Sequence, residues 1–178
     1  MGRTSLIAAA LLLAASVNPY VEHLQYQNPI PFMLSHYALF AAGLLLGRSY
    51  LRLPGWFLAM GAAVAVYWHL PGPFAASSSL FPYRAVEELS MVAGGVLAGG
   101  ARVGARVEQA SFALWVAGDT ALSVVFISWP APYSIPPSSF SPQEFPLTGV
   151  AMILLMNLIV AFVIYAYLRR MYARVEAG

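Results

Sequence analysis

Ionisable side chains lie inside or beside long apolar segments of this 178-residue chain. His36 lies about two helical turns inside one apolar segment, roughly 9 Å from its end at ~1.5 Å per residue. His69 lies near the end of the next apolar segment. Glu87 and Glu88 fall in the first turn of a further segment, and Asp119 lies near the middle of the one after it. An ionisable group within a membrane-spanning helix is costly to keep, so each is a candidate functional residue.

Two methionines lie at helical spacing from these candidates. Met33 and His36 are three residues apart and share a helix face, as do Glu88 and Met91. Imidazole nitrogen suits copper, iron and zinc, and thioether sulfur suits Cu(I). The pattern therefore predicts a metal pocket in the outer leaflet, formed by His36, His69, Glu88, Met33 and Met91. Four further residues are candidates for supporting the ligands or exchanging protons: Glu22, His23, Glu87 and Asp119.

The same residues allow two other interpretations. His36 and His69, if they lie on adjacent helices, would suit the two axial positions of a haem b that carries electrons. Alternatively, no cofactor is bound, and the cluster binds a proton or a partner in an accessory subunit of a respiratory complex or in a transporter. The chain has no Cys, which excludes thiolate metal sites and a Cys nucleophile. No catalytic residue is predicted, and we expect a protein that is not an enzyme.

Each candidate also has a purely structural explanation. A histidine near a helix end is often an interface residue, and a buried methionine often only fills the core. Glu87 or Glu88 would then cap its helix and pair with Arg84. The glycine pairs 94–95 and 99–100 indicate close packing between helices rather than a phosphate-binding loop.

The composition is that of an integral membrane protein. Hydrophobic residues make up 60% of the chain and charged residues 9%, against roughly 25% charged residues in an average soluble domain. Nine Arg and no Lys face seven acidic residues, a formal charge of +2, which is too little for a nucleic-acid-binding surface. We therefore expect one membrane domain over residues 1–178, in contact with the lipid bilayer and not with nucleic acid.

Six apolar stretches approach the length of about 20 residues that a spanning helix needs. We expect an all-α, six-helix transmembrane bundle with spans at about 5–22, 30–47, 54–70, 84–101, 109–129 and 146–168. The first stretch, with its early arginine and small residues at 14–16, would also fit a cleaved signal peptide.

The arginines test the number of spans independently. With six crossings, one side of the membrane holds Arg3, Arg48, Arg52, Arg102, Arg106, Arg169, Arg170 and Arg174, and the other side holds only Arg84. An excess of arginine marks the cytoplasmic side. This bias predicts a multi-pass protein of the plasma membrane with both termini in the cytoplasm and loops 20–29, 71–83 and 130–145 outside.

Short motifs in this order resemble those of the CtaG-type cytochrome-oxidase assembly factors. Residues 35–39 (Ser-His-Tyr-Ala-Leu) are similar to their His-containing helix, and residues 68–71 (Trp-His-Leu-Pro) to their His-x-Pro signature. Residues 84–90 (Arg-Ala-Val-Glu-Glu-Leu-Ser) resemble their His-(Ala)-x-Glu-His segment, and residues 129–133 (Trp-Pro-Ala-Pro-Tyr) their closing Pro-x-x-Tyr. The start at residues 18–22 (Asn-Pro-Tyr-Val-Glu) is similar to that of a small archaeal family of uncharacterised membrane proteins of about this length.

The resemblance implies copper handling during assembly of a respiratory oxidase, with oxidase subunits as partners. Arg84 and Glu88 stand where the CtaG-type factors have two histidines. Glu88 has a side chain that can bind a metal, whereas the guanidinium of Arg84 does not. Half of the imidazoles that the resemblance implies for the whole site are therefore missing.

Overall fold

Asparagine and proline residues mark where several of the helices begin. Asn18 precedes α2 (Pro19–Gln27), and its side-chain oxygen accepts a hydrogen bond from the Val21 amide at 3.0 Å. Asn28 precedes α3 (Pro29–Tyr50) and accepts from the Ile30 amide at 2.8 Å. α5 (Pro71–Ser79) and α6 (Phe81–Gly100) also begin with proline in the first turn. A proline there costs no helical hydrogen bond, because the first amides of a helix have no partner within it.

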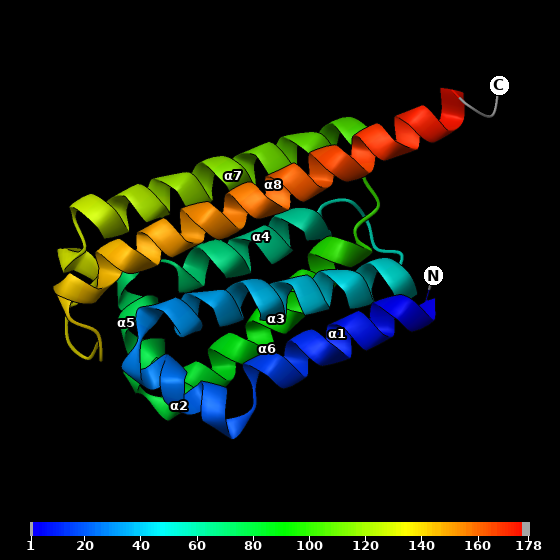
Figure 1. Cartoon of the computed structure of the whole chain (residues 1–178). Helices are drawn as coiled ribbons and strands as arrows, with labels where there is room; N and C mark the ends of the chain where they lie inside the picture. The colour runs from blue at the N-terminus through cyan, green and yellow to red at the C-terminus, as the bar shows by residue number, and fades with distance from the viewer. Residues whose placement is uncertain (1, 176–178) are drawn as a thin grey trace.

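The computed structural model describes residues 2–175 and shows a chain built of helices (Figure 1). The remaining elements are α1 (Gly2–Ser16), α4 (Phe57–Trp68), α7 (Ala105–Ser128), α8 (Phe145–Val175) and the 3-10 helices η1 (Ala131–Tyr133) and η2 (Pro142–Glu144). Between residues 2 and 175 the one extended contact is a parallel bridge of Leu53 with Ala101. The expected all-α class is confirmed. The expected domain, 1–178, also includes residues 1 and 176–178, which lie outside the described part.

Within residues 2–175, fewer than six helices have the length and composition of a membrane span. Among the described residues, α3, α7 and the segment Pro142–Arg169 have both, and α1 with α2 would form a fourth span that is bent by 55°. α4 has only 12 residues, and the 20 residues of α6 include Arg84, Glu87 and Glu88. The predicted spans at 54–70 and 84–101 are therefore helices, but not clearly spans. The predicted outer loop 71–83 contains α5, which the sequence analysis did not foresee.

α3 and α6 lie at the centre and pack closely through small residues. A Cβ atom added at Gly43 would lie 2.2 Å from the Val92 carbonyl oxygen, and one added at Gly95 would lie 2.2 Å from that of Phe40. The backbones therefore touch where glycine removes the side chain, as the glycine pairs of α6 predict. α1 packs against α3, and α4 packs against α6.

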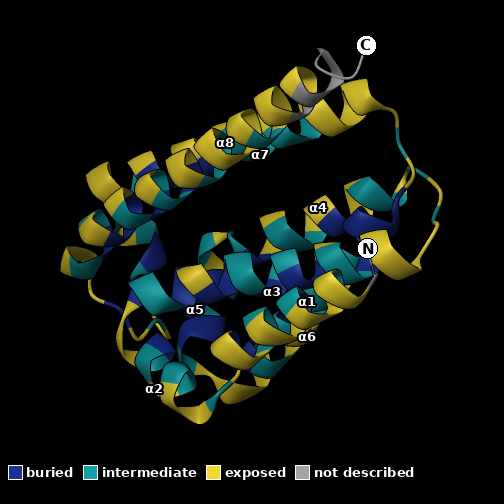
Figure 2. Cartoon of the chain, turned by 45° about the vertical axis from the view of Figure 1, so that its right-hand side comes forward, coloured by how far each residue is buried: buried dark blue, intermediate teal, exposed yellow. Residues whose placement is uncertain are grey.

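α7 and α8 form an antiparallel hairpin beside this group. Figure 2 shows exposed residues over the hairpin and buried residues gathered on α3 and near α5. Aromatic side chains join the hairpin to α3 and α5 at one end: Phe32, Phe74, Phe126, Tyr133, Phe140 and Phe145. The Phe74 and Phe126 rings lie 5.8 Å apart, and those of Phe126 and Phe145 lie 4.9 Å apart. We call this end, which carries α2, α5, η1 and η2, the aromatic end.

The arginine-bearing connections meet at the opposite end. Arg48 forms an ion pair with Glu108 at 3.2 Å, and Arg102 Nη2 donates to the Leu51 carbonyl at 2.6 Å. α1 begins and α8 ends at this same end of the molecule (Figure 1). The start of α1 and the end of α8 lie together because the chain runs along the bundle an even number of times.

Candidate functional site

A histidine and a carboxyl group face one another between the two central helices. His36 Nε2 on α3 lies 3.1 Å from Glu87 Oε1 on α6, and both side chains are only 1% exposed. His36 Nδ1 donates a hydrogen bond to the Phe32 carbonyl one turn earlier, at 2.8 Å. Because Nδ1 carries a hydrogen, Nε2 either accepts a proton from a neutral Glu87 or donates one to an ionised Glu87. A hydrogen bond between them would in both cases need one proton; in the structure the two atoms are in contact, but neither His36 Nε2 nor either Glu87 oxygen has a hydrogen-bond partner.

His69 lies against the other side of His36. The two ring centroids are 5.2 Å apart with an angle of 62° between the planes, an edge-to-face contact. His69 Nδ1 donates to the Ala65 carbonyl at 2.6 Å, and the His69 carbonyl accepts from the Tyr133 hydroxyl at 2.9 Å. The predicted proximity of the two imidazoles is therefore present, and η1 holds the end of α4 beside it.

Arg84 is buried in the same region without a carboxylate as its hydrogen-bond partner. It is 1% exposed, and its Nη1 donates to the Gln25 side-chain oxygen at 2.8 Å. Its guanidinium also lies over the Phe32 ring, 4.1 Å from the centroid, and over the Tyr26 ring at 4.7 Å. The sequence predicts that Arg84 pairs with Glu87 or Glu88. In the structure, its hydrogen bond goes to Gln25 instead, and its guanidinium lies over two aromatic rings. An arginine is charged at all accessible pH values, so a permanent positive charge lies inside the protein.

Gln25 accepts two hydrogen bonds from this arginine, one at its side-chain oxygen and one, from Nη2 at 3.5 Å, at its backbone carbonyl. Besides Arg84, its side-chain oxygen accepts from Ser35 Oγ at 2.9 Å, and its amide nitrogen donates to the Ser16 carbonyl at 2.8 Å. Gln25 gives no signal in the sequence, because a neutral amide adds nothing to the charge pattern. Arg84 itself gave a signal, since it is the one arginine apart from the other eight.

Glu88 lies beside Glu22 and away from His36. The Glu88 carboxyl interacts electrostatically with the Glu22 carboxyl of α2, and both side chains are partly buried. Neighbouring helical residues point about 100° apart, so only one of Glu87 and Glu88 can face α3. Glu87, expected in a supporting role, has the position next to His36 that the sequence analysis gave to Glu88.

The other predicted residues lie elsewhere. Met33 packs in the aromatic end, and Met91 packs with Leu39 and Trp68 in a second core cluster. His23 is exposed and hydrogen-bonds Gln27 at 3.0 Å. The carboxyl of Asp119 accepts a hydrogen bond from the Tyr37 hydroxyl across the α3–α7 contact.

The donor set fits the two predicted cofactors unequally. Both imidazoles have Nδ1 fixed by a carbonyl, the arrangement that orients Nε2 in many metal-binding histidines. Even so, no three His, Asp or Glu side chains in the described part of the chain surround a common metal position. The edge contact between His36 and His69 leaves no gap for a porphyrin between the rings, so a haem with these axial ligands does not fit.

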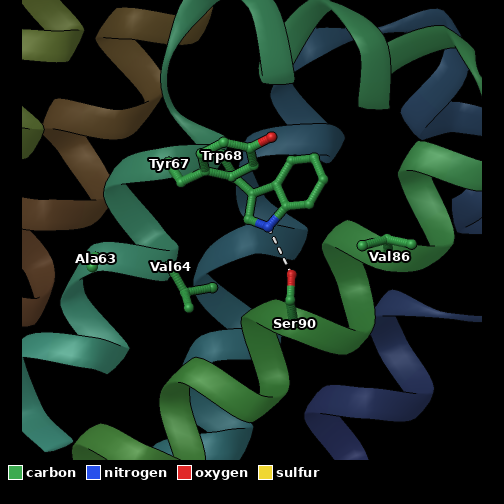
Figure 3. Close-up of a pocket in the computed structure, with 6 residues that line it drawn as sticks. All are labelled: Ala63, Val64, Tyr67, Trp68, Val86 and Ser90. Carbon is green, nitrogen blue, oxygen red and sulfur yellow. Dashed lines mark hydrogen bonds between the residues drawn. The ribbon is translucent and has the colours of Figure 1, made fainter.

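An apolar groove between α4 and α6 borders this site (Figure 3). Its volume is about 370 Å³, and its lining is Ala63, Val64, Tyr67, Trp68, Val86 and Ser90. Trp68 Nε1 donates to Ser90 Oγ at 2.6 Å, and Ser90 Oγ donates to the Glu87 carbonyl at 3.0 Å. The groove wall therefore steadies the turn of α6 that carries Glu87.

Comparison with known proteins gives a single family. A family model described as a protein of unknown function (DUF1404) matches residues 7–170. No curated protein and no solved structure matches the chain. This match contains no link to the CtaG-type factors, so that resemblance stays a prediction.

Proposed function

We propose, for a chain that belongs to the DUF1404 family of unknown function, that it is a membrane protein which binds and releases a proton at the buried His36–Glu87 pair. It would serve as a cofactor-free accessory subunit or transport protein, in which protonation of this pair changes the contact between α3 and α6. The observation that carries the proposal is the 3.1 Å contact of two titratable groups that are both 1% exposed.

Two features support a location in the membrane: the apolar surface of the α7–α8 hairpin and the uneven distribution of the arginines. Large apolar side chains are exposed along the hairpin, among them Leu114 at 73%, Leu158 at 69% and Phe162 at 69%. We propose six crossings, by the α1–α2 pair, α3, α4, α6, α7 and α8. The arginine-rich end would lie in the cytoplasm and the aromatic end outside, in the plasma membrane.

The geometry of the His36–Glu87 pair makes the contact favourable only when the pair carries a proton. With Nδ1 of His36 committed to the Phe32 carbonyl, removal of the shared proton leaves two lone-pair-bearing atoms facing one another at 3.1 Å. That arrangement is unfavourable in a site without water, because a buried acceptor has no other donor. Loss of the proton should therefore move Glu87 or separate α3 from α6, which links proton release to a change of shape.

Infrared and nitrogen NMR spectroscopy of the protein in lipid nanodiscs test this function. As the pH passes through the range in which histidine and carboxyl groups titrate, we expect coupled changes in a protonated-carboxyl band and in the His36 ring-nitrogen signals. The Glu87→Gln variant should lose both responses. Glu108→Gln, which alters an exposed acid at the arginine-rich end, is the matched control and should keep them. A wild-type protein with no response in either signal would contradict the proposal.

A second candidate function is copper handling for a respiratory oxidase, with oxidase subunits as partners. It is favoured by the two imidazoles whose Nδ1 atoms are fixed by carbonyls and whose rings touch. His36, His69 and Glu87 would be the ligands after a rotation of side chains, and copper bound there would be cargo for delivery. Metal content after loading with Cu(I) tests it: His36→Ala should lose copper that His23→Ala retains. Equal copper in wild type and His36→Ala would exclude this function.

A further inference from the structure

We infer that exposed arginines on two neighbouring helix connections form a surface that binds the phosphate groups of anionic phospholipids in the cytoplasmic leaflet. The residues of this surface, which we call the arginine patch, are Arg48, Arg52, Arg102 and Arg106. The inference uses the proposed membrane location of the chain, but it is independent of proton exchange at the His36–Glu87 pair. It gives the protein a partner of stated chemistry at its arginine-rich end.

Two connections between helices carry the patch and are bonded to one another. One joins α3 to α4, and the other joins α6 to α7 (Figure 1). The Leu53 amide donates to the Gly100 carbonyl at 2.8 Å, and the Arg102 amide donates to the Leu53 carbonyl at 2.9 Å. Arg102 Nη2 also donates to the Leu51 carbonyl at 2.6 Å. The backbone on either side of Arg52 is therefore held against the backbone that carries Arg102.

Two of the four arginines are available to a ligand. Arg48 forms its ion pair with Glu108 at 3.2 Å. By contrast, the side chains of Arg52 and Arg106 form no hydrogen bond or ion pair with any other residue between 2 and 175. Both are exposed. Each guanidinium therefore presents its N–H donors outward, in the planar fork that matches two oxygens of a phosphate group.

The charge around the patch favours an anionic partner. Glu108 is the one acidic residue at this end of the molecule within residues 2–175, and it is already paired with Arg48. Arg3, at the start of α1, and Arg169, near the end of α8, add exposed positive charge at the same end. Arginine is charged at all accessible pH values, so this excess of positive charge is permanent.

Apolar side chains next to these arginines favour a lipid over a soluble acidic protein. Leu51 precedes Arg52 and is 37% exposed, and Val107 follows Arg106 and is 47% exposed. Trp56, which is 59% exposed, stacks on the Phe57 ring with the centroids 3.9 Å apart. Tryptophan is enriched at membrane–water interfaces, and basic side chains there attract anionic lipids. Such a surface can contact the acyl chains and the phosphate of one lipid together.

Native mass spectrometry of the full chain in detergent tests the inference by counting bound lipid molecules. We expect phosphatidylglycerol to bind more tightly than phosphatidylcholine. Its binding should weaken as the salt concentration rises, because salt screens exposed charges. In Arg52→Gln and in Arg106→Gln the affinity for phosphatidylglycerol should fall roughly five-fold, the scale of one basic side chain at an anionic membrane surface. The affinity for phosphatidylcholine should stay unchanged.

Two further variants separate charge from other effects of substitution. Arg52→Lys is the matched control: it keeps the positive charge and should retain most of the affinity that Arg52→Gln loses. Glu108→Gln should bind phosphatidylglycerol more tightly than the wild type, because it removes a negative charge and frees Arg48 from its ion pair. An effect of Glu108→Gln in the opposite direction would contradict the inference.

Soluble competitors identify the source of the phosphate. Glycerol 3-phosphate should not displace phosphatidylglycerol, because it has no acyl chains to lie beside Leu51 and Trp56. Displacement by it would mean that the surface binds a free phosphate ester. Binding of polyglutamate that depends on Arg52 and Arg106 would mean that the partner is an acidic protein. Either result would overturn the inference.

The inference and the proposed function can fail separately. Equal affinity of the wild type for the two lipids, or unchanged affinity in both Arg52→Gln and Arg106→Gln, would overturn the inference and leave proton exchange at His36 and Glu87 standing. Lipid selectivity in a protein whose His36 and Glu87 signals do not respond to pH would refute the proton exchange alone.

Discussion

Tyr37 donates a hydrogen bond from its hydroxyl to Asp119 Oδ1, and this bond joins the central helix α3 to the α7–α8 hairpin. Tyr37 directly follows His36, so one helix turn presents the imidazole to α6 and the phenol to α7. Asp119 is 8% exposed, and its second carboxyl oxygen has no hydrogen-bond partner. The hairpin therefore contacts the core through a polar bond near its middle as well as through the aromatic end.

Removal of the Tyr37 hydroxyl should loosen this contact. In Tyr37→Phe, Asp119 loses its donor while the ring packing against Trp115 stays. We expect a loss of about 1 kcal/mol in stability, the scale of side-chain hydrogen bonds between membrane helices. Thermal unfolding in nanodiscs measures it. Asp119→Asn keeps an oxygen acceptor for the phenol and should lose less; an equal loss in both variants would contradict this account of the bond.

Close packing of α3 on α6 predicts a sharp response to one methyl group. In Gly95→Ala the new Cβ would lie 2.2 Å from the Phe40 carbonyl oxygen, so the helices must separate. We expect a loss of about 1–3 kcal/mol, the range for overpacked sites. Gly118→Ala on α7, where nothing lies within 4 Å of the added atom, is the control and should gain up to about 1 kcal/mol from helix propensity.

Arg84 and Gln25 should respond unequally to replacement. Gln25→Leu removes the side-chain acceptor of the buried guanidinium and leaves only the 3.5 Å bond to the backbone carbonyl of residue 25, which we expect to cost about 3–5 kcal/mol. Arg84→Met removes the charge itself, while Gln25 keeps its bonds to Ser35 and the Ser16 carbonyl, so it should cost less. The double variant should be more stable than the two single losses together imply. Urea or thermal unfolding of all three decides it; strict additivity would mean that the two residues do not act as a pair.

The proposed topology can be tested with single cysteines, because the chain has none of its own. Ser139→Cys, in the exposed loop of the aromatic end, should be labelled by an impermeant thiol reagent added to intact cells. Gly104→Cys, between α6 and α7 at the arginine-rich end, should be labelled only after permeabilisation. The reverse labelling pattern would show that the protein lies in the membrane with the opposite orientation, and would contradict the prediction. Ser78→Cys should resist the reagent on either side, because Ser78 is fully buried.

The sequence predicts the parts of the site that depend on helical periodicity and on the free-energy cost of placing an ionisable side chain in an apolar segment. His36 and His69 stand out because an imidazole inside an apolar segment needs a reason to be there, and the structure brings their rings together. The glycines of α6 likewise predict a close helix contact from residue size alone.

The rest depends on angles and bends that a sequence does not contain. Whether Glu87 or Glu88 faces His36 depends on the rotation of α6, and a rotation of about 100° exchanges the two. The break at Asn18 and Pro19 turns α2 by 55° relative to α1. That turn brings Gln25 to Arg84 and Glu22 near Glu88, which are distant in sequence, so these two interactions were not predictable from spacing.

The helix order also has a consequence for how the chain is made. Every residue of the buried polar group, from Ser16 and Gln25 to Glu87 and Glu88, precedes residue 90, whereas the hairpin begins at Ala105. Chains emerge from the ribosome N-terminus first, and early segments can fold before later ones are synthesised. The hydrogen bond between Arg84 and Gln25 and the contact between His36 and Glu87 can therefore form during translation. The hairpin would then dock against a centre that is already assembled.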